Sequence, residues 1–108
     1  MLQQLKKGVL EMLALEIICQ KSTYGYELMA RLKAQSSSLF SLKEGTLYPI
    51  LYRLEDEGLI VSAWSQGVGK NAPKKMYCAT EKGHQERLRR YQVWKTFSDT
   101  VDRFFGEG

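Results

Sequence analysis

The sequence predicts a mainly α-helical fold with one small β-hairpin. Three observations lead to this fold class: three short segments carry apolar residues at helical spacing, two short β-prone runs flank a basic segment, and helical periodicity then continues almost to the C-terminus. The 108 residues, 44% of them apolar and 26% charged, have the composition of a globular protein with one modest core. We therefore expect one compact unit, in which residues 1–79 form the helix-and-hairpin part and residues 80–108 form a C-terminal helix.

Two helices are expected at the N-terminal end. The first covers residues 5–20, where apolar residues at helical spacing form a wide stripe that should be largely buried. Residues 21–23 make a short polar break. The second helix covers residues 24–35, with Leu28 and Leu32 on one face, and it ends at a run of three serines.

A third helix is expected to begin near Lys43 or Glu44 and to end at Glu57. Its buried face follows from apolar residues spaced i, i+3, i+4 and i+7, namely Leu47, Ile50, Leu51 and Leu54. Gly58 follows at the C-cap position, where a left-handed glycine commonly ends a helix. The chain should then become extended.

The extended part is expected to be a hairpin. Residues 59–64 are rich in β-branched and aromatic residues, and within residues 75–79 Met76 and Cys78 alternate with their neighbours. Residues 66–74 join the two strands as a flexible, basic tip.

Thr80 is suited to cap a last helix that starts with Glu81. Apolar positions then recur almost to the end of the chain: Leu88, Tyr91, Trp94, Phe97, Val101 and Phe104. A helix of about 25 residues is roughly 37 Å long, which is too long for its apolar stripe to be covered by so small a domain. We expect these residues, with Leu5 and Val9 of the first helix, to form the seam of a homodimer.

Several classes of function are disfavoured. The longest apolar run, residues 10–19, contains two glutamates and is too short to span a bilayer, and no signal-peptide pattern is present, so a cytoplasmic protein with no membrane partner is expected.

Cys19 and Cys78 are expected to be small core residues, and a disulfide between them is disfavoured in a reducing compartment. The single histidine, His84, is expected at the surface. Because no catalytic or metal-ligating set is visible, we expect no enzyme, no metal and no cofactor.

Three short helices followed by a hairpin is the element order of a winged helix-turn-helix. In that fold the third helix enters the major groove of DNA, and the hairpin tip, or wing, lies along the backbone or minor groove. The net charge of +4 is compatible with a polyanionic partner. The outward side of the third helix would meet phosphates and base edges with Lys43, Glu44, Thr46, Tyr48, Pro49, Tyr52 and Arg53. The wing adds Lys70, Lys74 and Lys75.

Some of these assignments have alternatives that the sequence leaves open. The wing lysines could form an ordinary solvated surface. Tyr24, also a candidate for DNA contact, and Tyr26 could instead serve packing and positioning. Pro49 should clash with the carbonyl of Gly45, which either bends the start of the helix for presentation to DNA or is a tolerated kink.

The sequence resembles the PadR family of transcriptional regulators over nearly its whole length. The similarity is carried jointly by five segments: residues 24–28 (YGYEL), 44–51 (EGTLYPIL), 53–55 (RLE), 58–60 (GLI) and 75–80 (KMYCAT). The resemblance implies a homodimer that binds inverted-repeat operators, usually as a repressor, with the third helix as the reading element. A single long C-terminal helix is typical of the smaller family members.

The resemblance also draws attention to Trp94. This residue matches a tryptophan that lines the drug pocket between the subunits of multidrug-sensing relatives, and with Phe97 beside it the site would take a small aromatic effector. Alternatively, both residues belong to an ordinary dimer core. For the whole chain, the alternative to a DNA-binding repressor is a helical dimerisation module that has lost DNA binding and acts through protein contacts.

Overall fold

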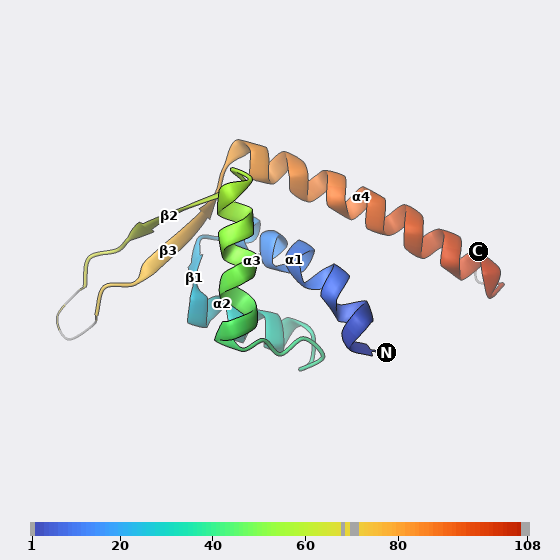
Figure 1. Ribbon diagram of the computed structural model, residues 1–108, viewed down its shortest axis with the longest axis horizontal. Coiled ribbons are helices and arrows are strands. Elements are labelled where there is room, and N and C mark those ends of the chain that lie inside the picture. The colour runs from blue at the N-terminus through green and yellow to red at the C-terminus, as the bar shows by residue number, and fades with distance from the viewer. Residues whose placement is uncertain (1, 68, 70–71, 107–108) are drawn as a thin grey trace.

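The computed structural model describes residues 2–67, 69 and 72–106, and for residues 2–8 the backbone alone. The described part of the chain forms four helices and three strands (Figure 1): α1 Leu2–Gln20, β1 Thr23–Tyr24, α2 Gly25–Gln35, α3 Glu44–Asp56, β2 Ile60–Trp64, β3 Lys75–Ala79 and α4 Glu81–Phe104. The β2–β3 hairpin projects from one end of the helical group and α4 from the other, so the molecule measures 57 × 29 × 20 Å. The predicted fold class is confirmed.

The short strand β1 is the element that the sequence pattern missed. The sheet has the order β1-β3-β2 with antiparallel neighbours, and it places Thr23 opposite Tyr77 and Tyr24 opposite Met76. Thr23 was expected in a polar break and Tyr24 in a helix, and both expectations were wrong. A strand of two residues is too short to show an alternating pattern, and it exists because β3, distant in sequence, supplies its hydrogen bonds.

The core lies between the first three helices and the inner face of the sheet. All four apolar residues predicted for the buried face of α3 are at most 4% exposed: Leu47, Ile50, Leu51 and Leu54. They share one cluster with Leu15 of α1, Leu28 of α2 and Tyr77 of β3. This packing decides which side of α3 remains outside.

Two expectations about burial need correction. The helix α1 was expected to be largely buried, but residues 9–13 are only half-buried, while further along the helix Ala14, Leu15, Ile17 and Ile18 are buried. Cys78 was expected in the core and is exposed, because the alternation of β3 gives the inward position to Tyr77. Cys19 is half-buried, and both cysteines are free thiols.

The helix α4 leaves the domain at a tight junction. Thr80 caps it as predicted, since its Oγ1 accepts a hydrogen bond from the Gly83 N–H at 3.0 Å. A Cβ on Gly83 would run into the carbonyl oxygen of Leu59, so a glycine is needed for α4 to lie this close to the chain before β2. Gly58 has a φ of 75° and ends α3 in the left-handed conformation that was predicted.

Beyond this junction α4 is largely uncovered. Of its residues, all of which the structure describes, only Gly83 is buried. The exposed fraction of its large apolar residues runs from 39% at Trp94 to 85% at Phe104. Figure 1 shows the reason: α1 lies near the first part of α4, whereas the C-terminal part extends beyond it.

Candidate nucleic-acid interface

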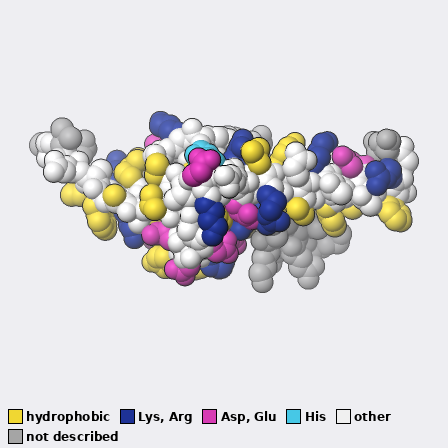
Figure 2. Space-filling view, turned by 90° about the horizontal axis from the view of Figure 1, so that it is seen from above, with side chains coloured by type: hydrophobic (Ala, Val, Ile, Leu, Met, Phe, Trp, Pro, Cys, Tyr) yellow, Lys and Arg dark blue, Asp and Glu magenta, His cyan; other side chains and the backbone are white. Residues whose placement is uncertain are grey.

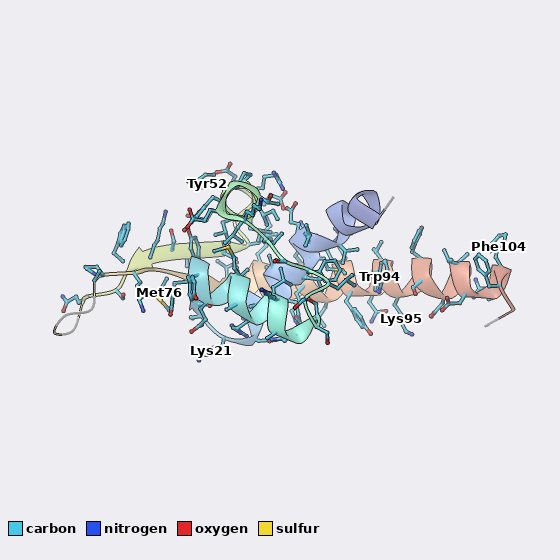
Figure 3. The ribbon with its side chains drawn as sticks, turned by 90° about the horizontal axis from the view of Figure 1, so that it is seen from below. Lys21, Tyr52, Met76, Trp94, Lys95 and Phe104 are labelled. Atoms are coloured by element: carbon cyan, nitrogen blue, oxygen red, sulfur yellow. The ribbon has the colours of Figure 1, made fainter. Side chains whose placement is uncertain are left out.

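The outer side of α3 carries most of the residues predicted to contact DNA. Its exposed side chains are Lys43, Glu44, Thr46, Pro49, Tyr52 and Arg53. Lys43 takes the N-cap position with an extended backbone and makes no side-chain cap, and the helix continues through Pro49 without interruption. Figure 3 shows Tyr52 pointing away from the body of the domain. We call this surface the α3 strip.

Tyr48 is half-buried because it packs on the start of α2. A Cβ added to Gly25 would lie 2.9 Å from the Tyr48 hydroxyl oxygen, so Gly25 makes room for the phenol. The centres of the Tyr48 and Tyr52 rings lie 6.4 Å apart. Tyr48 therefore packs α3 against α2, and its ring lies next to that of Tyr52.

The wing brings two lysines to the same region. The Nζ of Lys74 lies 4.2 Å from the centre of the Tyr24 ring, which is a cation–π contact, and the Nζ of Lys75 lies 5.8 Å from the centre of the Tyr77 ring. Tyr24 thus packs against the wing. Lys70, the third predicted wing lysine, lies outside the described residues.

A hollow of about 440 Å³ lies between the wing, the start of α2 and α3. Aromatic residues and lysines dominate its walls, among them Tyr24, Tyr26, Tyr48, Tyr52, Trp64, Lys74 and Lys75. Trp64 was not among the residues predicted for this surface, although its side chain is 70% exposed. The alternation of β2 contained the signal, because Trp64 shares a face with Ser62, whose hydroxyl donates to Glu55 of α3 at 3.1 Å.

Arg53 differs from the rest of the α3 strip. Its Nε lies 3.3 Å from Oε2 of Glu11, so the guanidinium is engaged by α1. Four residues later, Glu57 accepts from Nη2 of Arg90 at 3.0 Å. The C-terminal end of α3 is therefore attached to both α1 and α4, while its N-terminal end is open.

A second candidate surface follows α4. The seam residues predicted on α4 are all exposed: Leu88, Tyr91, Trp94, Phe97, Val101 and Phe104. Figure 2 shows hydrophobic side chains gathered along the projecting part of this helix, and Figure 3 places Trp94 near its middle and Phe104 at its end. Val9 of α1 is half-buried, and the side chain of Leu5 lies outside the described part. We call this surface the α4 stripe.

Two hollows adjoin Trp94. The first, of about 290 Å³ between α1 and α4, is lined by Met12, Leu13, Glu16, Arg87, Leu88, Tyr91 and Trp94. The second, of about 600 Å³, is lined by Glu11, Met12, Glu57, Arg89, Arg90, Val93, Trp94 and Phe97. The centres of the Trp94 and Phe97 rings lie 6.1 Å apart. The two predicted ligand residues therefore border the same open space.

Tyr77 and Glu86 are ionisable groups near these surfaces whose pKa values are strongly shifted. Burial raises the pKa of Tyr77 to about 12, so its phenol stays neutral behind the wing. Hydrogen bonds from Arg89 and, to a smaller extent, from Arg90 lower the pKa of Glu86 to about 2. Glu86 is therefore a permanent negative charge at the point where α4 passes α1.

Within the residues that the structure describes, no helix has the length and apolar character needed to cross a membrane. The same part of the chain has no group of three or more histidine, cysteine, aspartate or glutamate side chains that could hold a metal ion. His84 is exposed, as predicted.

Comparison with known proteins connects this geometry to a family. The model of the transcriptional regulator PadR-like family matches residues 14–89. The crystal structure of a PadR-like transcriptional regulator from Bacillus cereus is 34% identical, with a TM-score of 0.80 over 94% of this chain and 96% of that chain. A PadR family transcription regulator from Clostridium difficile is 30% identical, with a TM-score of 0.77 over 90% of this chain and 98% of that chain.

A transcriptional regulator from Clostridium thermocellum, at 23% identity, shares the fold with a TM-score of 0.84 over 94% of this chain and 97% of that chain. These similarities confirm the family resemblance found in the sequence. The homologues are transcriptional regulators, which confirms that the chain is not an enzyme. The chain belongs to the PadR-like family of transcriptional regulators.

Proposed function

We propose that this chain represses transcription by binding an inverted-repeat DNA operator as a homodimer. The observation that carries the proposal is the open α3 strip beside the wing lysines. Thr46 and Tyr52 offer polar groups to base edges and phosphates, and Lys74 and Lys75 offer cations to the DNA backbone. Two such surfaces related by a dimer axis would reach successive major grooves, so we expect half-sites about one helical turn, or a multiple of it, apart.

The other residues of the proposed DNA interface are included on the basis of different observations. Tyr24 and Tyr48 are held by packing against the wing and α2. Lys43, Glu44, Pro49 and Arg53 belong to the proposal because they lie on the α3 strip, and Lys70 belongs to it from the sequence alone.

The occupant that we propose for the α4 stripe is a second copy of this chain. From Trp94 onward the stripe recurs at intervals of three and four residues, which is the spacing of a two-helix seam. An apolar stripe of this length is unusual on a monomer, and a two-fold axis would place the same stripe on both subunits. The proposed interface comprises Leu5, Val9, Leu88, Tyr91, Trp94, Phe97, Val101 and Phe104.

A small aromatic effector is proposed for the space beside Trp94. The hollow of about 600 Å³, which Trp94 and Phe97 both line, is within the size range of small-molecule sites. A second subunit would close it and add a second indole. A ligand that favours one dimer geometry would change operator affinity by about 5- to 150-fold, the range of typical allosteric couplings. The alternative is that Trp94 and Phe97 only pack the dimer core.

The DNA-binding proposal is tested by selection of duplexes from a random library, followed by a salt titration. The variant K74Q/K75Q should lower the slope of log affinity against log salt by up to about 0.9 for each lost phosphate contact. The control K33Q/K95Q removes the same charge from α2 and α4 and should keep the slope. An unchanged slope in the wing variant would remove Lys74 and Lys75 from the interface. Failure of the wild type to retain any duplex would favour the protein-interaction module.

The effector proposal is tested with planar cationic dyes in the absence of DNA. The W64F variant leaves Trp94 as the single tryptophan, so its fluorescence reports on the hollow. We expect saturable quenching by at least one dye. If no dye quenches Trp94, this residue belongs to the dimer core.

A further inference from the structure

A cluster of ion pairs lies at the C-terminal end of α3, the helix proposed to enter the major groove and called the recognition helix below. At its centre is Arg90 of α4, whose side chain is 21% exposed. Its Nε lies 3.0 Å from Oε1 of Glu86, its Nη2 lies 3.0 Å from Oε2 of Glu57, and its Nη1 lies 3.8 Å from Oε1 of Glu11. One guanidinium therefore contacts carboxylates from α4, from the end of α3 and from α1.

The cluster holds α3 at two points. Glu11 is shared, since its other oxygen lies 3.3 Å from Nε of Arg53, one turn before Glu57. The backbone carbonyl of Glu57 also accepts a hydrogen bond from Nζ of Lys82 at 2.7 Å. The end of the recognition helix is thus fixed to α4 by two side chains, Arg90 and Lys82.

The direction of α4 depends on such polar contacts, because apolar burial does little to hold this helix. Gly83 at its first turn is its single buried residue, and Leu88 is 56% exposed. Arg87 pairs with Glu16 of α1, and Arg90 is the next arginine contact with the domain along the helix. Partly exposed ion pairs add little to stability, but the planar guanidinium with its fixed donors restricts geometry.

We propose that Arg90 is a positioning residue for DNA binding: it sets the angle between the recognition helix and the α4 stripe, and so the half-site spacing that the dimer accepts. This inference rests on the proposed function, because it needs both the α4 dimer and an inverted-repeat site. Val101 lies eleven residues beyond Arg90, or about 16 Å along the helix, so a tilt of about 12° moves it by about one base-pair step of 3.4 Å.

The test compares spacing profiles. The inverted repeat selected by the wild type is rebuilt with its half-sites moved closer or further apart by one to three base pairs, and a duplex with one half-site is included. The wild type should lose about tenfold or more in affinity when the spacing changes by two base pairs. R90M keeps a long apolar side chain but removes the guanidinium, and its profile should flatten to less than about threefold. Its affinity for the single half-site should stay at the wild-type value.

Two further variants make the result decisive. R89M is the control, because Arg89 is 64% exposed and within the described residues pairs with Glu86 on its own helix; it should keep the wild-type profile. E57Q removes the α3 partner of Arg90 from an exposed position and should flatten the profile, so it gives the answer if R90M fails to fold.

A variant that loses affinity equally for all spacings and for the half-site has only lost stability, and that result overturns the role of Arg90. The same holds if R90M and E57Q keep the wild-type profile. If the wild type selects no duplex, the proposed function fails and this inference fails with it. If the wild type selects a site and the profiles do not change, only the inference fails.

Discussion

The helices α3 and α4 have the same kind of amphipathic pattern, but the apolar face of α3 is buried and that of α4 is exposed. The apolar face of α3 is at most 4% exposed, whereas the α4 stripe is 39% exposed or more at every position. Within residues 9–79 the chain supplies partners for the buried apolar faces of α2, α3 and the sheet, although Val61 and Trp64 of β2 remain exposed. Along most of α4 it supplies none within the described part. This contrast supports the proposal that the α4 stripe is one half of an interface.

The two regions also differ in what holds them in place. The helix α3 is fixed by interlocking apolar side chains, which tolerate little change of shape. The helix α4 is fixed by a glycine junction at Gly83 and by arginines that contact α1 and the end of α3. Changes to the first region should have their main effect on stability, and changes to the α4 stripe and its arginine contacts should have their main effect on assembly and geometry.

The largest effect is expected from a charge in the α4 stripe. W94E would bury an unpaired carboxylate in the proposed dimer seam, which costs several kcal/mol, so the dimer should weaken by about 100-fold or more. Q92E places the same charge at an exposed polar position of α4 and should leave the dimer intact. Sedimentation velocity over a range of concentrations measures both. A W94E protein that dimerises like the wild type would contradict the proposed seam.

A core truncation should affect stability instead. L51A removes a side chain that is 0% exposed and should lower the free energy of unfolding by about 2–5 kcal/mol. V93A shortens a residue of α4 that is 57% exposed and should change stability by less than about 0.5 kcal/mol. Urea unfolding at one fixed protein concentration tests the pair, because dimerisation makes stability depend on concentration. Similar losses in both variants would mean that α4 is packed like the core.

The junction should show an intermediate effect. G83A adds a methyl group against the Leu59 carbonyl and should destabilise the protein by about 1–3 kcal/mol, because the backbone must shift. G45A is the matched control in α3, where an added Cβ meets nothing within 4 Å, and it should be neutral or stabilising by up to about 1 kcal/mol. The same urea experiment applies. If G83A is as stable as the wild type, α4 does not lie against Leu59 as described.

The smallest effect concerns pH. The pKa of Glu86 falls from its ordinary value of 4.5 to about 2 in the folded chain, so the unfolded chain binds more protons in this interval. The contribution of Glu86 to stability is therefore complete above about pH 4.5 and is lost as the pH falls toward 2. E86Q should flatten the loss of stability over this range. An unchanged acid unfolding curve would show that Arg89 and Arg90 do not hold the carboxylate.

Local patterns were sufficient to predict much of the fold. The spacing of Leu47, Ile50, Leu51 and Leu54 predicted the buried face of α3, and Thr80 and Gly58 predicted two helix ends, because each signal acts within a few residues. The strand β1 and the inward side of β3 were mispredicted, since both depend on pairing with distant segments.

The candidate site was predictable to a similar extent. The outward side of α3 followed from subtracting its buried face, but the half-buried position of Tyr48 depends on contact with Gly25 of another helix. The pairing of Arg53 with Glu11 joins residues far apart in the sequence, and no spacing rule connects them. Strand alternation alone could have assigned Trp64 to the face of β2 that it shares with Ser62, next to α3.

We propose that two copies of this chain, joined through α4, place two α3 strips on one duplex. The most direct measurement is the stoichiometry of the complex between the protein and the selected inverted-repeat duplex, determined by sedimentation with a labelled duplex during titration. We expect two chains per duplex throughout the titration, with no complex of one chain at low protein concentration. A saturated complex that holds one chain per duplex, or W94E binding the duplex as tightly as the wild type, would contradict it.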